Sequence, residues 1–522
     1  MSRVNRNQRK FALSFVFLPL LFILLQGCNS EKPPAPEKSA ANTKTPPRMQ
    51  PLLEGWTEPS FALVLTGEQH GYLEPCGCSE TQSGGIARRH DLIKQIRQRG
   101  WETVGLDAGG TLKRFGTQSK IKFDAILQAL KEMDVRAVNV GPEELMLGAA
   151  DLYARHLNFA EESDPEKSLT FLSSNLTLFG DPNLGTPVRQ KVFAVGGNRV
   201  GVTSVVSPEL TREVPYLQGD NPEMALSDPI EAVGAALGEL EQQNPDLLVL
   251  LSHGSLELAE QLAKEYPALR LILSTGGPED GKRKPIFVGD TMIVQIGHKG
   301  KYAGVVGYYP GEQPPLKYEL VDLDMYRFKN SPEMIEVMRD YQDRLRDEQV
   351  IENDSPIRHP SGYTFVGSKK CGECHTKAYA TWSTTKHSHA FESLEKGRAG
   401  QEATWVTRIY DPECISCHTT GWNQDNVLRY DSGYLNQQQT PHLVGQQCEN
   451  CHGPGSHHTD LESRYKMDRK SVEFEQLVQS RREIQLTELN AKSVCIRCHD
   501  YENSPQFEFE KYWPKVKHVG RD

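Results

Sequence analysis

The sequence predicts an α/β layered domain followed by a mainly α, loop-rich domain. The chain has 522 residues, 37% hydrophobic and 25% charged, which is enough for two or three packed cores. Short apolar runs alternate with helical patterns between residues 56 and 324, as in an α/β fold. Most of the eleven cysteines lie between Cys371 and Cys498, so the C-terminal region has a chemistry of its own.

Residues 1–27 predict an export signal. Basic residues precede an apolar run over 11–25, which is too short to span a bilayer comfortably. The run ends in Leu25-Gln26-Gly27-Cys28, which resembles the bacterial lipoprotein box, where the cysteine is lipidated. An ordinary cleaved signal or an uncleaved anchor are the alternatives. A two-chain lipid on Cys28 would attach the mature, extracytoplasmic chain to a membrane, with the proline-rich residues 28–55 as a tether.

Residues 56–324 predict the α/β layered domain. The expected strands are 61–65, 103–106, 137–140, 200–206 and 247–251, and the expected helices are 86–96, 121–133, 229–240 and 256–264. Polar residues follow or end the strands, at Glu68, His70, Asp107, Ser252 and His253. In open α/β sheets ligands bind at such strand ends.

The stretches 66–71, 84–88, 106–110, 173–175, 251–254 and 294–304 resemble the calcineurin-like metallophosphoesterases, in their exported 5'-nucleotidase branch. The resemblance implies a site for two metal ions, but most expected ligands are replaced. Glu68-x-His70 stands for an Asp-x-His pair, Gly109-Gly110 for the bridging Gly-Asp, 141–144 for Gly-Asn-His-Glu and 276–279 for Gly-His-x-His. Only His70 and His253 remain by type, with Glu68 as a third candidate.

Without a bridging carboxylate, the two-metal clamp is hard to build. We therefore expect a degenerate metallophosphoesterase-like scaffold in which a metal ion is doubtful, with an altered single-metal site as the alternative. His253 alone also fits a structural strand-end histidine.

Cys76 and Cys78 lie in the loop after the first strand, near His70. Two thiols at this spacing can ligate a soft metal, form a strained redox-active disulfide or attack as thiolates. A structural disulfide in an oxidising compartment is the alternative.

Residues 325–361 predict a helical connector. Ser331 and Pro332 suit a helix start, with serine as the cap. Met334, Met338, Tyr341 and Leu345 then form one apolar stripe, which we expect to pack between the two domains. An oligomerisation helix is the alternative.

Residues 362–522 carry four Cys-x-x-Cys-His motifs, the attachment sequence of haem c. They comprise Cys371, Cys374 and His375; Cys414, Cys417 and His418; Cys448, Cys451 and His452; and Cys495, Cys498 and His499. Zinc ribbons or a disulfide framework would not need a histidine after every second cysteine. The sequence therefore predicts four haem c groups, with the four motif histidines as proximal iron ligands.

Further histidines in this region can supply distal ligands, namely His359, His387, His389, His442, His457, His458 and His518. The stretches 366–368, 382–394, 411–421 and 448–455 resemble the tetrahaem cytochrome c family typified by the electron acceptor of hydroxylamine oxidoreductase. That resemblance implies His387 on the third haem, His458 or His457 on the first and His518 on the fourth. It also implies an open second haem, which His442 could close.

The leading hypothesis is an extracytoplasmic, lipid-anchored tetrahaem cytochrome that carries electrons between redox partner proteins. In it, the α/β domain docks partners or presents substrate. A second hypothesis is a redox enzyme for a small nitrogen or sulfur compound, at the second haem or at Cys76 and Cys78. A third is a 5'-nucleotidase-like hydrolase fused to a cytochrome. The net charge of −10 and the lack of long basic runs argue against nucleic acid as a partner.

Overall fold

The computed structural model describes residues 50–75, 82–160, 164–220, 222–397 and 404–518. The predicted export signal, Cys28 and the Cys76/Cys78 pair lie outside these ranges. Among the described residues, no helix has both the length and the apolar character needed to cross a bilayer.

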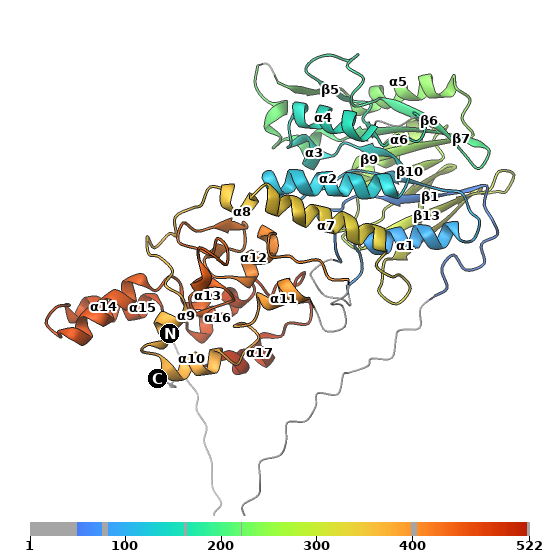
Figure 1. Cartoon of the computed structure of the whole chain (residues 1–522). Helices are drawn as coiled ribbons and strands as arrows, with labels where there is room; N and C mark the ends of the chain where they lie inside the picture. Colours follow the sequence, from blue (N-terminus) through green and yellow to red (C-terminus); the bar gives the residue numbers. More distant parts are fainter. Residues whose placement is uncertain (1–49, 76–81, 161–163, 221, 398–403, 519–522) are drawn as a thin grey trace, which may run out of the picture. The chain divides into compact units, whose positions relative to one another are not determined.

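Two six-stranded sheets form the centre of the α/β region (Figure 1). The first has the order β14 (Leu316–Asp322), β13 (Tyr302–Tyr308), β1 (Phe61–Thr66), β2 (Thr103–Asp107), β3 (Val135–Asn139) and β4 (Thr170–Leu172). The second has the order β11 (Ile286–Val288), β12 (Thr291–Val294), β10 (Leu271–Gly276), β9 (Leu247–Ser255), β7 (Asn198–Val206) and β6 (Gln190–Val195). Strands β1 to β4 are parallel, as are β7, β9, β10 and β12, so their carboxyl ends gather at one edge of each sheet. A two-stranded ribbon, β5 (Leu176–Leu178) with β8 (Met224–Leu226), completes the strands of this region.

Apolar side chains fill the space between the sheets, among them Leu63, Val104 and Val249. Helices cover the outer faces. α5 (Pro229–Glu241) and α6 (Leu256–Glu265) pack on the second sheet. The first sheet is covered by α1 (Ile86–Arg97), α2 (Thr117–Glu132), α4 (Ala149–Ala160) and α7 (Pro332–Asp347), with the short α3 (Pro142–Leu145) beside α4. This helix, sheet, sheet, helix order confirms the predicted α/β layered fold.

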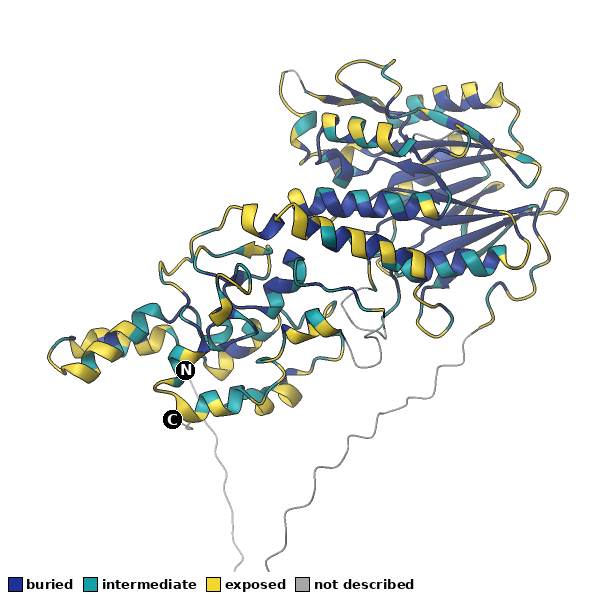
Figure 2. Ribbon diagram, in the orientation of Figure 1, coloured by how far each residue is buried: buried dark blue, intermediate teal, exposed yellow. Residues whose placement is uncertain are grey.

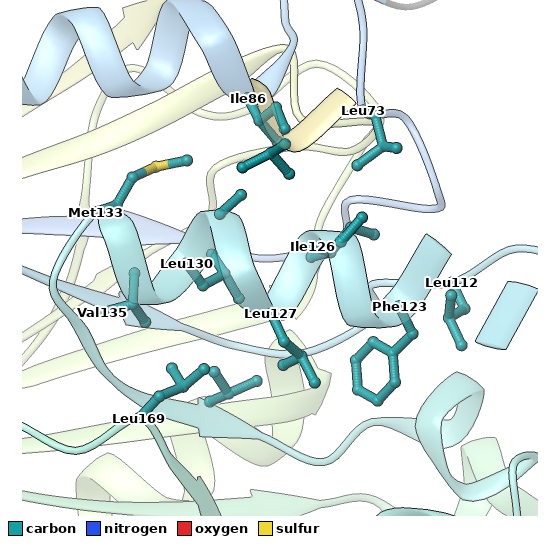
Figure 3. Close-up of a cluster of buried hydrophobic side chains, with 14 of the residues drawn as sticks. Leu73, Ile86, Leu112, Phe123, Ile126, Leu127, Leu130, Met133, Val135 and Leu169 are labelled. Carbon is teal, nitrogen blue, oxygen red and sulfur yellow. The ribbon is translucent and has the colours of Figure 1, made fainter. Parts of the chain in front are cut away.

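Helix α2 shows how the sequence pattern produces the outer layer. Its apolar residues recur every three or four positions, so Phe123, Leu127 and Leu130 lie on one buried face (Figure 3). They pack with Val135 of β3 and Leu169 just before β4. Figure 2 shows the same alternation of buried and exposed faces along the helices that flank the sheets.

The predicted apolar stripe of α7 is buried, and it packs against α1 and α2. Ser331 occupies the N-cap position, but its side chain makes no capping hydrogen bond. Its hydroxyl instead lies 2.9 Å from Nδ1 of His90. The predicted helix start is therefore confirmed, with Ser331 at the N-cap and Pro332 in the first turn, although the serine hydroxyl has a tertiary partner in place of a capping hydrogen bond.

The C-terminal region is mainly α-helical with long loops, as predicted. Its helices are α8 (Val350–Asn353), α9 (Ser368–Gly372), α10 (Thr376–Trp382), α11 (Glu392–Lys396), α12 (Pro412–His418), α13 (Cys448–His452), α14 (Ser456–Met467), α15 (Phe474–Glu483), α16 (Glu488–Cys495) and α17 (Phe509–Val516). One small hairpin joins β15 (Trp422–Asn423) to β16 (Leu428–Arg429). The apolar clusters of this region are small compared with those around the sheets.

Candidate functional site

Each Cys-x-x-Cys-His motif lies on or beside a short helix. The second and third motifs fall within α12 and α13, and the first and fourth lie at the C-terminal ends of α9 and α16. Residues three or four apart share one face of a helix, so both sulfurs and the histidine can face one ligand. None of the eight cysteines in the motifs forms a disulfide.

Three motif histidines face a second histidine from elsewhere in the chain. The ring centroids are 6.3 Å apart for His375 and His458, 5.9 Å for His452 and His518, and 6.0 Å for His387 and His499. Imidazoles on opposite sides of one metal ion, with metal–nitrogen distances of about 2.0–2.1 Å, have centroids about 6 Å apart. The three pairs therefore fit the spacing that two axial histidines of one haem iron require.

Hydrogen bonds at Nδ1 fix the orientation of two of these imidazole rings. Nδ1 of His452 lies 2.8 Å from the Ile484 carbonyl oxygen, and Nδ1 of His499 lies 2.9 Å from the Ser504 hydroxyl. Such contacts leave Nε2 for a metal ion. Burial lowers the pKa of the imidazoles, which favours the neutral form that ligates metals, at His387, His418, His452, His458 and His499.

Two of the expected histidine pairings are exchanged in the structure. We expected His387 opposite the third motif and His518 opposite the fourth. Instead His387 faces His499 of the fourth motif, and His518 faces His452 of the third. Backbone contacts hold this arrangement, since the His387 carbonyl accepts from Gln446 N at 3.0 Å. Spacing along the chain carries no information on which motif a distant histidine reaches.

The remaining histidines have other surroundings. His457 stacks on Tyr363 with centroids 4.6 Å apart, so His458 is the one that faces the first motif. His389 is exposed and lies 2.8 Å from Glu392. His442 lies in a 3₁₀ turn, Pro441–Leu443, that packs against α9 of the first motif.

His418 of the second motif differs from the other three. Its Nδ1 lies 2.7 Å from the Ala390 carbonyl oxygen, so its Nε2 is also oriented for a ligand. Within the part of the chain that the structure describes, no other imidazole makes a ring contact with it.

A second group of polar side chains lies at the carboxyl edge of the sheets. The three candidates from sequence, Glu68, His70 and His253, come together there. Glu68 Oε2 is 2.7 Å from His70 Nε2, and Glu68 Oε1 is 3.4 Å from His253 Nε2. Burial alone would raise the pKa of Glu68, but the His70 hydrogen bond and the nearby histidines lower it below its ordinary value.

The structure adds His298, which the sequence analysis missed. Its Nε2 lies 3.8 Å from Glu68 Oε2. Glu143 also faces the group, with Oε2 3.9 Å from His253 Nε2, and burial raises the pKa of Glu143. His298 comes from the loop after β12, inside the stretch 294–304, whose resemblance to the metallophosphoesterases was carried by residues 294–297 and 302–304.

Two neighbouring carboxylates have structural partners instead. Asp107 accepts hydrogen bonds from the Thr66 hydroxyl and from Gly109 N, at 2.5 and 2.9 Å. Glu144 accepts from the backbone N–H groups of Thr111 and Gly141 at 2.7 and 2.8 Å. Both carboxylates hold the loops at the sheet edge in place.

Polar contacts join the α/β region to the second and fourth motifs. Glu413 of α12 pairs with Lys122 and with Arg114, the latter at 3.0 Å. The buried Asp411 accepts from Gln118 at 2.7 Å and from Tyr341 of α7 at 3.2 Å. The stripe of α7 thus packs on the α/β region, and the buried hydroxyl of Tyr341 reaches Asp411 of the C-terminal region.

Glu502, three residues after His499, reaches the sheet edge. Its Oε1 lies 2.6 Å from Lys299 Nζ, and it also contacts Tyr72 and Lys113. These contacts lower the pKa of Glu502 to about 2, although burial alone would raise it. Lys299 directly follows His298, so the fourth motif is tied to the loop that carries the added histidine.

Comparison with known proteins gives a relative for each region. Residues 370–453 match the family model of cytochrome c554 and c-prime. Cytochrome c-554 of Nitrosomonas europaea is 30% identical over 153 residues, which cover 27% of this chain and 60% of that protein.

The α/β region is similar to nucleotidases. Snake venom 5'-nucleotidase of Crotalus adamanteus is 21% identical over 248 residues, which cover 42% of this chain and 39% of that protein. The structure of a 5'-nucleotidase precursor from Thermus thermophilus aligns with a TM-score of 0.47 and 22% identity, over 55% of this chain and 59% of that one. The protein thus joins a phosphoesterase-like α/β region to a C-terminal region that resembles cytochrome c554.

Proposed function

We propose that this protein is an extracytoplasmic tetrahaem c-type cytochrome that carries electrons between redox partners. The observation that carries the proposal is the set of three facing histidine pairs beside three of the four attachment motifs. When bound, haem iron supplies reversible one-electron transfer. The chain's own contribution is to fix the orientation of each imidazole and to exclude water from it.

In this proposal three of the haem groups would be held by His375 with His458, His452 with His518, and His499 with His387. Each pair joins segments far apart in the sequence, so iron ligation cross-links a region whose apolar clusters are small. His418 would hold the second haem, and within the described ranges no second imidazole faces it.

The α/β region acts in this proposal as a docking or substrate-presenting module. Its support is the set of contacts from Arg114, Lys122 and Gln118 to the helix of the second motif. Lipid on Cys28 would keep the assembly at a membrane outside the cytoplasm, within reach of redox proteins.

Since no imidazole faces His418 in the part of the chain that the structure describes, a second candidate function is favoured. Haem held by His418 without a second histidine would leave room for a small nitrogen or sulfur compound to bind the iron. The second motif would then be the site of a redox reaction, with the other three as its electron supply. Cys76 and Cys78 remain the other proposed site for such chemistry.

A count of haems and spin states tests the proposal. Pyridine haemochrome and intact mass should give four haems per chain in protein matured in a haem c-competent host. Electron paramagnetic resonance should show three low-spin irons and one high-spin iron. A sample that holds zinc in place of haem would refute the proposed cytochrome. A sample with four low-spin irons would refute the proposed open site at the second haem.

A matched pair of variants tests the exchanged ligands. His387→Gly should add one high-spin signal, because the fourth haem loses its distal ligand. His389→Gly, two residues along the chain and exposed, should leave the spectrum unchanged. The reverse result would refute the assignment of His387.

The hydrolase alternative also has a direct test. We expect no hydrolysis of nucleotides or phosphodiesters by the full chain, since Gly109 and Gly110 supply no carboxylate to bridge two ions. Turnover that divalent metal ions stimulate would restore this alternative.

A further inference from the structure

Glu449 directly follows Cys448 in the third attachment motif, and it is only 3% exposed. Its carboxylate accepts hydrogen bonds from three backbone N–H groups of other segments. Oε1 accepts from Val366 N and Gly455 N at 2.9 and 2.7 Å, and Oε2 accepts from Gly367 N at 2.7 Å. Burying a carboxylate without such donors would be strongly unfavourable, so this side chain and these N–H groups depend on each other.

The N–H groups that bind Glu449 lie at the starts of two helices. Gly367 is the N-cap of α9, and Gly455 is the N-cap of α14. A glycine has no side chain that could cap its helix, so the first turn of each helix relies on partners from elsewhere. Glu449 thus joins the starts of α9 and α14 to α13, the helix of the third motif.

The two joined helices carry the histidine pair of the first motif. α9 contains Cys371 and leads directly to His375, and α14 contains His458. The two rings have centroids 6.3 Å apart and an interplanar angle of 24°. One carboxylate from another motif therefore holds the backbone from which both rings of this pair extend.

The ring of His458 depends strongly on this backbone support. Its Nδ1 is buried and has no hydrogen-bond partner among the described residues. His452 and His499, in contrast, are oriented by contacts of their Nδ1 atoms. The position of α14 therefore sets where the His458 ring lies, and Glu449 holds the start of that helix.

Neighbouring hydrogen bonds strengthen the same junction. Ser368 N, at the first position of α9, donates to Gln447 Oε1 at 2.5 Å. Thr364 N donates to Ser456 Oγ at 2.9 Å, and Ser456 N donates to the Thr364 carbonyl at 3.2 Å. Each of these bonds connects two segments, whereas Glu449 connects three.

The junction requires an acceptor at both oxygens of the Glu449 side chain. A glutamine in its place has the same size but carries one NH₂ group. In one orientation this group would face Gly367 N, and in the other it would face Val366 N and Gly455 N. Two donors would then oppose each other, so glutamine breaks the junction without opening a cavity.

We propose that Glu449 is a positioning residue for the first haem. Its carboxylate holds α9 and α14 at the separation at which His375 and His458 would hold the same haem. The inference rests on the proposed cytochrome function and extends it, because it gives the third motif a second role. Besides attaching its own haem, this motif would order the ligands of the first haem.

Electron paramagnetic resonance of the full haem-loaded chain tests the inference. Glu449→Gln should weaken one of the three expected low-spin signals by about twofold or more and raise the high-spin signal, because the rings of the first pair are no longer held together. His458→Gly supplies the reference spectrum of a first haem without its distal ligand. Adding Glu449→Gln to His458→Gly should change the spectrum no further, since the carboxylate acts through that histidine.

Glu373→Gln is the matched control. Glu373 also lies inside an attachment motif, but its side chain is 61% exposed and pairs with Lys370 at 2.6 Å. Its spectrum should equal that of the wild type. Gly455→Ala serves if Glu449→Gln does not mature with four haems. Its Cβ atom would lie 3.3 Å from Glu449 Oε1, so it should displace the carboxylate and weaken the same low-spin signal.

Two results would overturn the inference. The first is a variant that melts at a lower temperature but keeps the wild-type haem spectrum, because Glu449 would then only stabilise the fold. The second is a double variant whose spectrum differs from that of His458→Gly alone. Wild-type protein that matures without haem would instead refute the proposed cytochrome function itself.

Discussion

The α/β region and the C-terminal region are stabilised in different ways. Around the two sheets, large clusters of apolar side chains are almost completely buried, including Phe61, Phe123 and Phe171. In the C-terminal region the two clusters are small, and most cysteines and histidines of the motifs are only partly buried. In Figure 2 the strands of the two sheets are mostly dark blue, whereas the helices of the C-terminal region are mainly teal and yellow.

Among the described residues, the side chains of the α/β region thus form a much larger apolar core than those of the C-terminal region do. Burial of apolar surface contributes about 25 cal/mol per Å², so a domain with few buried residues needs another source of stability. Covalently attached haem would supply apolar area and iron cross-links in the C-terminal region. Three experimental changes test whether the two regions differ in what stabilises them.

The largest expected effect comes from omitting haem. Expressed without haem attachment, the C-terminal region should fail to fold, because its core groups and axial cross-links are missing. The α/β region should still melt cooperatively. Limited proteolysis with mass spectrometry should therefore yield a resistant fragment that ends between residues 348 and 370.

If the C-terminal region resists protease without haem, the proposed difference in stabilisation between the two regions is wrong. Protein matured with haem, digested in parallel, is the control. It should be protected over both regions.

The second effect is a cavity in the α/β core. Leu127 is fully buried on α2, so Leu127→Ala should destabilise the α/β region by about 2–5 kcal/mol (Figure 3). Denaturant unfolding followed by circular dichroism measures the loss. The haem absorption spectrum should not change.

Leu489→Ala is the matched control, because Leu489 is 95% exposed. It should change stability by less than about 0.5 kcal/mol. A spectral change in Leu127→Ala would mean that the two regions do not fold independently.

The smallest effect concerns the contact between the regions. The pKa of Glu502 falls from 4.5 to about 2 in the folded protein, so its contacts stabilise the folded state above pH 4.5. That contribution should be lost as the pH falls from 4.5 towards 2. Since Lys299 and Glu502 are partly exposed, we expect at most about 1 kcal/mol.

Thermal melts of the wild type and Glu502→Gln between pH 7 and pH 3 check this expectation. The difference between the two proteins should shrink as the pH falls, and should also shrink in high salt. A difference independent of pH would show that the carboxylate charge plays no part.

Much of the architecture could be predicted because it depends on local patterns. All five expected strands and four expected helices are present, since apolar periodicity reports directly on which face is buried. Helix α2 begins at Thr117, four residues before the predicted start, because no apolar residue marks its first turn.

The sequence by itself predicted the haem chemistry of this protein, because each of the four Cys-x-x-Cys-His motifs is complete within five consecutive residues. Only the tertiary structure decided the partners. It paired His387 with His499 and brought His298 to Glu68, and among the residues that it describes it placed no imidazole opposite His418. These contacts join segments separated by a hundred residues or more, or depend on how loops pack. No local preference of the chain encodes such distances.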